Sequence, residues 1–373
     1  MKILVVFAIS NRGGGSETFL INFLTRFSKL PNYEIVCFLP EERKDAYQIG
    51  NEKVKYIYIS EEIIRNPFKR LKYENFTVKK MIKEINPDII FIPSEAIPVS
   101  WKNLRSKIIT NVHSTIQTSS YKTFFSRSFR ENYDYFIRKR SLKLSDHIIF
   151  VSHLSMAEIK YKFAINDEKA VVIYHGVNID ENEYNKTDEY GDFILSVGDR
   201  YEHKNYELMI YLFSKLINKY ELNSNLVIIG RKKVEKIDNR IFELISKLHL
   251  EKRVILLDNV PYLEIGKYYS SAKLYLNTST WESFGITPLE AMSYKLPCVI
   301  CNASALAEVY NDNLVYIDPK IESDVVMIDK IYKVYSDNTI REKYIDKGYS
   351  FAKKFSWDES INNYIRYFER IDI

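Results

Sequence analysis

Two glutamates beside a predicted helix start are the residues of this sequence best suited to chemistry on a polar ligand. They lie in residues 281–292 (WESFGITPLEAM), where Glu282 and Glu290 flank a Ser-Phe-Gly turn. A glycine just before a helix lets backbone amides approach a phosphate, and the helix dipole favours the anion. The segment therefore predicts an anion-binding turn at Gly285.

The same segment also admits a purely structural interpretation. Thr287 has the chemistry of an N-cap, Pro288 suits the first helical position, and Glu290 would then fall at N3. On this interpretation Thr287 and Glu290 form a capping box. The box leaves Glu282 and Gly285 unexplained, so the anion-binding interpretation accounts for more of the segment.

A second candidate segment follows a predicted strand at residues 196–205 (SVGDRYEHKN). Gly198 allows a tight turn, and Arg200 with Lys204 offers two cations to a diphosphate. Basic residues in a loop are commonly no more than solvated charges. Their place at the carboxyl end of a strand, where ligands of α/β folds bind, favours a functional role.

The elements that must position these residues alternate between strand and helix. Residues 18–30 have helical periodicity. Apolar, strand-like runs occur at residues 2–7, 34–39, 55–59, 88–92, 107–111, 147–151 and 171–174, and again at 193–197, 225–229, 254–257, 274–277, 297–301 and 313–316. The polar, acidic residues 178–192 separate the two series. This pattern predicts two doubly wound α/β domains in tandem, with ligands beyond the carboxyl ends of the strands.

Composition limits the class of protein. The chain has 373 residues, 46% of them hydrophobic and 28% charged, which is typical of a folded globular protein of two domains. We find neither a signal-peptide pattern nor an apolar stretch of membrane-spanning length, and we expect a cytoplasmic protein. Three cysteines, Cys37, Cys298 and Cys301, are too few for a disulfide framework and lack the second pair of a zinc site.

Charge is unevenly distributed. Residues 1–175 contain 28 Lys and Arg against 18 Asp and Glu, whereas the remainder contains 26 against 31. A basic first half suits an anionic partner, and residues 65–83 and 122–143 combine cations with aromatic residues. These two segments either dock peripherally on an anionic membrane or form ordinary solvated helices. No nucleic-acid-binding module is evident.

Taken in order, these motifs resemble glycosyltransferase family 4, the retaining family with the two-domain GT-B fold. The resemblance covers nearly the whole chain. It rests on residues 14–17 (GGSE), His113 in NVHS, residues 151–152, residues 175–178 (HGVN), Arg200 with Lys204, Glu282 with Glu290, residues 304–308 and residues 355–360 (FSWDES).

The fold that the resemblance implies has two Rossmann-like domains facing across a cleft. Residues 1–178 would form the acceptor-binding domain, 179–192 a linker and 193–354 the nucleotide-sugar-binding domain. Residues 355–373 would form a helix that packs back on the first domain.

The resemblance also implies an activity. We expect retaining, metal-independent transfer of a hexose or N-acetylhexosamine from a UDP- or GDP-linked sugar to a glycan or lipid-linked acceptor, in bacterial cell-surface polysaccharide or glycolipid synthesis. No D-x-D cluster stands at a matching place. We therefore expect neither a metal nor a cofactor.

Site roles follow residue by residue from the resemblance. Arg200 and Lys204 would neutralise the leaving diphosphate, and Glu290 would bind the ribose hydroxyls. Glu282 and the turn after it would lie against the donor sugar and diphosphate, and His113 near the sugar. The predicted catalytic set is Glu282, Arg200, Lys204 and His113, and the donor-binding set is Gly14, Gly15, Gly198, Gly230, Ser283, Phe284, Gly285, Ile286 and Glu290.

The sequence departs from the family pattern at two places. Tyr174 and His175 replace a common proline and asparagine, and alanines replace the glycines usual near residues 304–308, which weakens any nucleotide role for His175 or Glu308. Two other classes stay open: a sugar-nucleotide epimerase of the same fold, and a non-catalytic GT-B partner protein. An epimerase needs no acceptor, so product analysis separates the first from a transferase.

Overall fold

The structure is a computed structural model that describes residues 1–373 except 11–14, 48–52, 114–128, 180–185, 259 and 372–373. The chain divides into two compact units. Unit 1 comprises residues 1–175 and 357–373, and unit 2 comprises residues 176–356. Part of the expected linker is tied to unit 2, because the Thr187 amide donates to the Ser271 hydroxyl at 2.8 Å.

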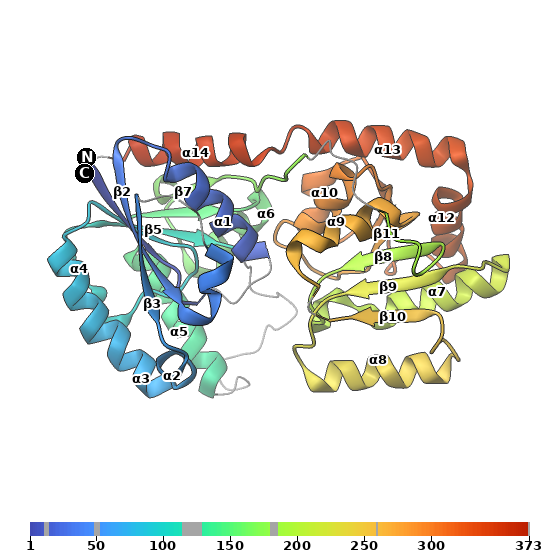
Figure 1. The fold of residues 1–373 in the computed structure, drawn as a ribbon, viewed down its shortest axis with the longest axis horizontal. Helices are drawn as coiled ribbons and strands as arrows, with labels where there is room; N and C mark the ends of the chain where they lie inside the picture. Colours follow the sequence, from blue (N-terminus) through green and yellow to red (C-terminus); the bar gives the residue numbers. More distant parts are fainter. Residues whose placement is uncertain (11–14, 48–52, 114–128, 180–185, 259, 372–373) are drawn as a thin grey trace. The chain divides into compact units, whose positions relative to one another are not determined.

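Unit 1 is built on a parallel sheet of seven strands in the order β3-β2-β1-β4-β5-β6-β7 (Figure 1). The strands are β1 Lys2–Phe7, β2 Tyr33–Pro40, β3 Val54–Ile59, β4 Ile89–Ile92, β5 Lys107–Val112, β6 His147–Phe150 and β7 Ala170–Val172. They appear in the sequence as continuous apolar runs because a parallel sheet is covered on both faces.

Helices flank this sheet in unit 1. They are α1 Gly15–Phe27, α2 Glu61–Arg65, α3 Pro67–Lys72, the π-helical η2 Tyr73–Val78, α4 Lys79–Ile85, α5 Phe129–Leu144, α6 His153–Phe163 and α14 Trp357–Glu369, with 3-10 turns η1 Glu41–Tyr47, η3 Val99–Trp101 and η5 Asp167–Lys169. The first helix begins at Gly15 and ends at Phe27, about one turn earlier than its apolar periodicity predicts.

The last helix, α14, belongs to unit 1 and packs on α1. Aromatic rings make this contact: Tyr364 lies 5.3 Å from Phe19, and Phe368 lies 5.4 Å from Phe27, measured between ring centroids. Aromatic pairs at such distances add to the free energy gained by apolar burial. Helix α14 thus completes the hydrophobic core of unit 1.

Unit 2 repeats the plan with six parallel strands in the order β10-β9-β8-β11-β12-β13. The strands are β8 Phe193–Val197, β9 Asn225–Ile229, β10 Val254–Leu257, β11 Leu274–Asn277, β12 Cys298–Cys301 and β13 Val315–Ile317. The helices are α7 Tyr206–Tyr220, α8 Glu235–Lys247, α9 Tyr262–Ser271, α10 Ile286–Ser293, α11 Ala305–Tyr310, α12 Asp324–Ser336 and α13 Asn338–Ala352, and η6 Glu202–Lys204 is a 3-10 turn.

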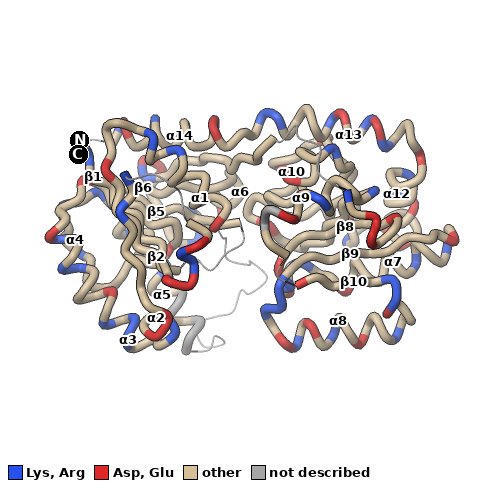
Figure 2. The backbone as a smooth tube through the Cα atoms, in the orientation of Figure 1, with Lys and Arg blue, Asp and Glu red and all other residues tan. Residues whose placement is uncertain are grey.

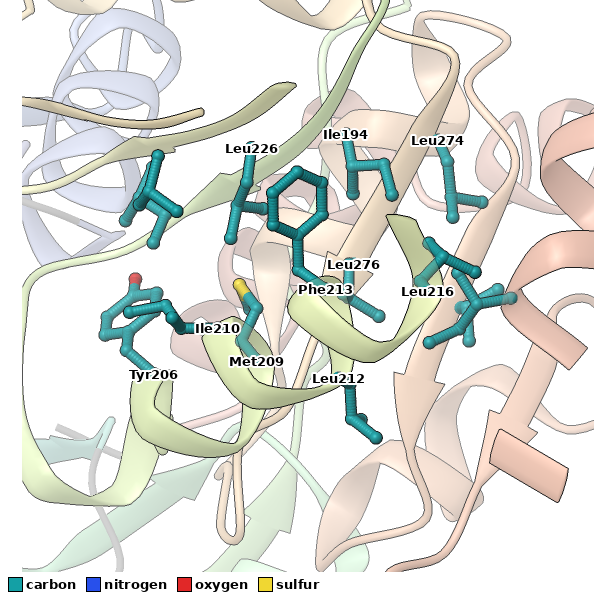
Figure 3. Packing of buried hydrophobic residues seen from close by; sticks show 14 of the residues in the cluster. Ile194, Tyr206, Met209, Ile210, Leu212, Phe213, Leu216, Leu226, Leu274 and Leu276 are labelled. Carbon is teal, nitrogen blue, oxygen red and sulfur yellow. The ribbon is translucent and has the colours of Figure 1, made fainter. Parts of the chain in front are cut away.

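Helix α7 supplies a large part of the core of unit 2. Its residues Met209 and Phe213, one turn apart, face Ile194 of β8 and Leu226 of β9 (Figure 3). All four side chains are at most 1% exposed. Burial of this order is worth about 1.5–3 kcal/mol for each large apolar side chain.

Both sheets reverse their strand order once. In unit 1 the reversal lies between β1 and β4, and in unit 2 between β8 and β11. Such a switch point opens a crevice at the carboxyl ends of its two strands, where doubly wound folds bind ligands. The loops after these four strands are therefore where a functional site is expected.

Candidate active site

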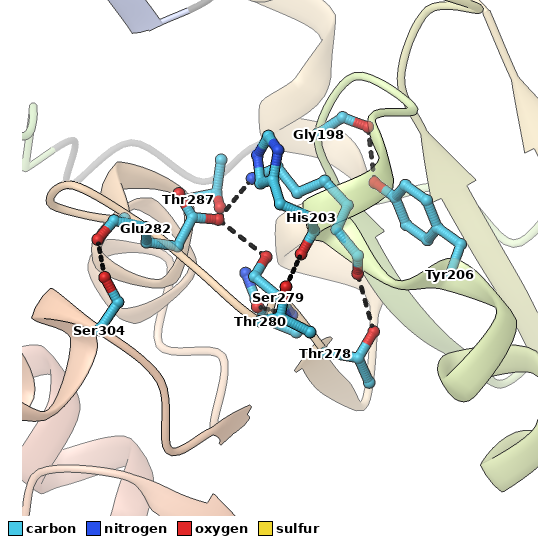
Figure 4. A network of polar contacts seen from close by, with 12 residues as sticks. Gly198, His203, Tyr206, Thr278, Ser279, Thr280, Glu282, Thr287 and Ser304 are labelled. Carbon is cyan, nitrogen blue, oxygen red and sulfur yellow. Dashed lines mark hydrogen bonds and ion pairs between the residues drawn. The ribbon is translucent and has the colours of Figure 1, made fainter. Parts of the chain in front are cut away.

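The loops that follow β8 and β11 meet at the switch point of unit 2. The Thr278 hydroxyl donates to the carbonyl oxygens of Lys204 and Asn205 at 3.1 and 3.0 Å. The Thr280 amide donates to the carbonyl oxygen of His203 at 2.7 Å (Figure 4). These bonds hold the two loops together as one platform.

An ion pair joins the two loops through their side chains. The Lys204 Nζ atom lies 2.6 Å from Glu282 Oε1, with the side chains 15% and 12% exposed. The Ser279 hydroxyl donates to the same carboxylate oxygen at 2.8 Å. Burial acts to raise the pKa of Glu282, but the Lys204 ammonium and the Ser279 hydroxyl hold that pKa below its usual value. The site therefore contains a largely dry ammonium bound to an ionised carboxylate.

The turn after Glu282 requires glycine. Gly285 has φ +77° and is the N-cap of α10, and a Cβ atom there would lie 2.4 Å from Leu306 Cδ2. The Glu282 carbonyl oxygen accepts from the Ser304 hydroxyl at 2.6 Å, which ties the turn to the start of α11. The turn thus opens directly into a helix N-terminus, whose amides attract an anion.

The capping-box interpretation of this segment is wrong. Helix α10 begins at Ile286, so Thr287 and Pro288 are its second and third residues and Glu290 its fifth. The Thr287 hydroxyl accepts a hydrogen bond from the Tyr275 hydroxyl at 2.7 Å. The N-cap is Gly285, in the left-handed conformation. Helix α10 therefore starts two residues earlier than a Thr287 cap would predict.

Glu290 is held inside unit 2. Its Oε2 accepts from the Tyr269 hydroxyl at 3.1 Å, and the Tyr269 ring stacks on Tyr294 at 5.3 Å. Burial raises the pKa of Glu290 to about 7, against the opposing effect of the Tyr269 hydrogen bond. A carboxylate of this kind changes its ionisation near neutral pH.

Arg200 is buried and paired with two carboxylates. Its guanidinium donates to both oxygens of Asp238 at 2.9 and 3.0 Å and pairs with Asp258 at 2.8 Å, and the side chain is 2% exposed. Burial acts to lower the pKa of Arg200, but the two carboxylates raise it above the usual value. Arg200 thus ties the loop after β8 to α8, which carries Asp238, and its role at a diphosphate stays a prediction.

Two predicted glycines permit close contact between the loops after β8 and β9. A Cβ atom on Gly230 would lie 1.9 Å from the Gly198 carbonyl oxygen. A Cβ atom on Gly198 would lie 3.1 Å from Lys204 Cε. The Tyr206 hydroxyl donates to the Gly198 carbonyl oxygen at 2.6 Å (Figure 4). These glycines shape the loop that carries Lys204.

The remaining predicted residues of unit 2 lie along the same turn. Phe284 is 2% exposed and its ring lies 6.3 Å from that of Phe355, so its side chain belongs to the core. Ser283 and Ile286 are half-buried, and Ile286 is the first residue of α10. The turn therefore places the backbone of Ser283 and Ile286 beside the start of α10.

His113 follows β5, the strand next to β4 at the switch point of unit 1. Its Nε2 is 3.0 Å from Asn111 Nδ2 and its Nδ1 is 3.2 Å from His175 Nε2, and the two imidazole rings stack. Burial lowers the pKa of His113 to about 4. At neutral pH the uncharged form of His113 is favoured, and its ring nitrogens lie against Asn111 and His175.

The glycine loop after β1 is seen in part. Gly14 lies outside the described residues. Gly15 is exposed and is the first residue of α1. Unit 1 thus contributes Gly15 and His113 from the predicted list, and unit 2 contributes the others that are described.

Sequence reasoning missed several residues that the structure places at the switch points. In unit 2 these are Ser279 and Tyr269, and in unit 1 Ser10 and Glu95. Ser10, Glu95 and Ser279 are polar residues just beyond a buried strand, so the carboxyl-end rule applied to every strand would have found them. Tyr269 lies within α9 and carries no such signal.

The described residues contain no group of three or more His, Cys, Asp or Glu side chains placed to hold a metal ion. A helix long and apolar enough to span a membrane is likewise not found in the described part of the chain.

Comparison with protein-family models gives two matches. The model for Glycosyl transferases group 1 matches residues 178–351, and that for Glycosyltransferase Family 4 matches residues 13–181. Side by side, the two models cover the chain from the loop after β1 to α13.

Curated relatives and solved structures point the same way. The O-antigen chain mannosyltransferase RfbU of Salmonella typhimurium is 26% identical over 68% of this chain and 75% of its own. The N-acetylgalactosamine-N,N'-diacetylbacillosaminyl-diphospho-undecaprenol 4-alpha-N-acetylgalactosaminyltransferase of Campylobacter jejuni is 22% identical over 95% of this chain and 96% of its own. The crystal structure of Anabaena HepE in complex with UDP and glucose matches 100% of both chains with a TM-score of 0.79 at 15% identity. The fold of this chain is accordingly GT-B.

Proposed function

The chain belongs to glycosyltransferase family 4, and on that basis we propose that it transfers a hexose or N-acetylhexosamine from a UDP- or GDP-linked sugar to a glycan or lipid-linked acceptor. The reaction proceeds with retention of anomeric configuration and without a metal. The observation that carries the proposal is the Lys204–Glu282 pair, held at the switch point of unit 2 immediately before the N-terminus of α10.

This arrangement suits the departure of a nucleoside diphosphate. Breaking a glycosyl–phosphate bond builds negative charge on the leaving oxygen. The Lys204 ammonium and the amides at the start of α10 are fixed, partly dehydrated groups of the right sign. A preorganised donor of this kind contributes about 3–4 kcal/mol to the transition state. With these groups in place the reaction does not depend on a divalent cation.

The carboxylates have different tasks. Glu282 accepts a hydrogen bond from the Lys204 ammonium and so fixes the position of Lys204. Glu290 accepts hydrogen bonds from the ribose hydroxyls of the donor when it is ionised. Arg200 holds the loop that carries Lys204 through its ion pairs with Asp238 and Asp258, and its contact with the diphosphate stays a prediction.

The relatives support a surface-polysaccharide role. RfbU is an O-antigen mannosyltransferase, the Campylobacter jejuni relative acts on a diphospho-undecaprenol substrate, and HepE binds UDP and glucose. We therefore propose that this chain uses a nucleotide-diphosphate sugar and acts in bacterial cell-surface polysaccharide or glycolipid synthesis.

Thermal shifts with nucleotides test the donor site. The purified chain is melted with UDP, GDP, ADP, dTDP and CMP, each with magnesium and with EDTA. A ligand at about 100 times its Kd adds about 2.7 kcal/mol to the free energy of unfolding, which is visible in the Tm. We expect one nucleoside diphosphate to raise the Tm equally in both buffers. A shift that needs magnesium contradicts metal independence, and no shift with any nucleotide contradicts the donor site.

Unit 1 also has a surface suited to an anionic membrane, and we propose that it docks there peripherally. Phe68 and Phe76 are 84% and 71% exposed on the continuous helix formed by α3, η2 and α4. Exposed Lys72 and Lys80 share their face, each four residues from a phenylalanine. Figure 2 shows Lys and Arg gathered along these helices. Aromatic residues among cations bind the interface of a bilayer that carries acidic lipids.

Vesicle flotation tests this surface. We expect the wild type to float with phosphatidylglycerol-containing vesicles at low salt, and Phe68→Ser with Phe76→Ser to abolish flotation. Tyr161→Ser is the matched control, because Tyr161 is 92% exposed on a different helix, α6. Equal flotation of the double variant and the wild type would remove the membrane contact.

A further inference from the structure

Tyr269 of α9 reaches the carboxylate of Glu290 from a rigid position. Its ring stacks on that of Tyr294, the C-cap of α10, at 5.3 Å and lies 6.2 Å from that of Tyr275 in β11, measured between centroids. Tyr269 and Tyr275 are 2% and 0% exposed. A buried phenol packed against two rings from different elements has little freedom to change its rotamer, so its hydroxyl is fixed in space.

That hydroxyl binds one oxygen of Glu290. The Tyr269 hydroxyl donates to Glu290 Oε2 at 3.1 Å. An ionised carboxylate only accepts hydrogen bonds and has about four lone-pair sites, so one bond from Tyr269 leaves sites for the hydroxyls of a ligand. The same bond favours the ionised form of Glu290, because that is the form that accepts.

Burial and this hydrogen bond act on the pKa of Glu290 in opposite directions. Burial raises the pKa, the Tyr269 hydroxyl lowers it, and the result is about 7. The strands packed against α10 bring up Tyr275 and Cys298, and burial raises the pKa of both far above the usual values, so both stay uncharged. Helix α13 meets α10 at Gly348. Glu290 is thus the group among these whose charge changes near neutral pH.

We propose that Tyr269 is a positioning residue for the donor nucleotide, which orients the Glu290 carboxylate toward the ribose and keeps it in its accepting form at neutral pH. Tyr269 acts through Glu290 and not on the nucleotide itself. The inference rests on the proposed function and deepens it, because Glu290 is the residue assigned there to the ribose hydroxyls.

Calorimetric titrations of Tyr269→Phe with UDP and with GDP test the proposal. Phenylalanine keeps the ring and its stack on Tyr294 and removes only the hydroxyl. Because a hydrogen bond to a charged group is lost, the pH midpoint of nucleotide affinity should rise by about one pH unit. The Kd of the variant should then exceed that of the wild type about tenfold at pH 6 and about fivefold at pH 7. At about pH 9 the two values should meet, because Glu290 is then ionised in both proteins.

The pH series separates positioning from a merely structural role. A ratio of the two Kd values that is the same at every pH overturns the proposal, and so do equal Kd values at pH 6 and 7. A double variant adds a second test. In a Glu290→Gln background, Tyr269→Phe should change the Kd no further, because the carboxylate through which it acts is gone. An equal loss in both backgrounds overturns the proposal as well.

Tyr211→Phe is the matched control. The Tyr211 hydroxyl donates to Asp324 Oδ2 at 2.6 Å, so this variant removes the same kind of bond between α7 and α12 and should leave the Kd unchanged at every pH. If Tyr269→Phe melts below the temperature of the titration, Tyr294→Ala decides in its place, because it removes the ring on which Tyr269 stacks, and the same pH-dependent loss is expected. Failure of the proposed function looks different: neither nucleotide then binds the wild type at any pH, which overturns both proposals.

Discussion

In unit 1 the strand order reverses between β1 and β4, and in unit 2 it reverses between β8 and β11. The loops that follow these strands carry different chemistry in the two units. Unit 2 places a buried ammonium, two carboxylates and a helix N-terminus at its switch point. Unit 1 places three serines, a charge-balanced carboxylate and an uncharged histidine there.

This difference separates the two halves of a sugar transfer. For a nucleoside diphosphate, unit 2 presents the amides at the start of α10 and the Lys204 ammonium, which is paired with Glu282. The crevice of unit 1 presents polar groups, and its described lining contains no lysine or arginine. The fold provides the same crevice twice, and the residues placed after the strands decide which ligand each crevice takes.

Lys204 gives the strongest test of the difference between the two units. Lys204→Ala removes the ammonium at the unit 2 switch point, and we expect kcat to fall about a hundredfold or more because the leaving diphosphate loses a preorganised charge. Lys267→Ala, which removes a half-exposed lysine paired with Glu264 at 3.0 Å, should leave kcat unchanged. The measurement is steady-state turnover at saturating donor. Near-normal turnover of Lys204→Ala would mean that the Lys204 ammonium only holds the two loops together.

Titration of Glu290 in unit 2 should make the free energy of unfolding depend on pH, unlike that of His113 in unit 1. The pKa of Glu290 is raised from 4.5 to about 7 by burial, so the folded state holds its proton more tightly than the unfolded chain. The free energy of unfolding therefore falls between about pH 4.5 and 7, by up to about 3 kcal/mol, and levels off above. We expect Glu290→Gln to remove this slope in denaturant titrations at pH 5, 6, 7 and 8. A slope that persists in the variant assigns the titration to another group.

Nucleotide affinity should also depend on the ionisation of Glu290. It should rise with pH, whereas the free energy of unfolding falls. The ribose hydroxyls donate to ionised Glu290, so affinity should rise as pH passes through about 7 in the wild type. In Glu290→Gln the affinity should be weaker and independent of pH. Calorimetric titrations with the nucleotide found by thermal shift give both values. Equal affinity in the two proteins would remove Glu290 from the donor site.

The glycine turn of unit 2 allows a smaller test. Gly285→Ala places a side chain at φ +77° and against Leu306, and we expect a loss of about 2–3 kcal/mol in the free energy of unfolding. Gly191→Ala is the control for the backbone alone, because Gly191 has φ +56° and open space around it, so its cost should be about 1 kcal/mol. Thermal or urea unfolding gives the difference. Equal costs for the two variants would show that Leu306 moves aside freely.

The sequence predicts the strands of both sheets closely because parallel strands are continuous apolar runs, and the GT-B fold is confirmed. The start of α10 was mispredicted because the cap rule depends on side chains, whereas Gly285 ends the turn through its backbone. The partners of Arg200 could not be predicted, because Asp238 and Asp258, 38 and 58 positions away, meet it only in three dimensions. Glu95 and Ser10 lie just beyond buried strands, where the carboxyl-end rule finds them, whereas their arginine partners on α5 and α3 cannot be predicted from the sequence.

The smallest effect is expected at His113, and it tests whether unit 1 takes part in proton transfer. The pKa of His113 is lowered to about 4 by burial, so it stays uncharged across the working range of pH. His113→Asn should lower the Tm, because the stack with His175 and the contact with Asn111 are lost. The pH–rate profile between about pH 5.5 and 8 should keep its shape, because no proton moves through this ring. A profile that loses a limb in the variant would make His113 an acid or base in the reaction, and the chemistry would then no longer be confined to unit 2.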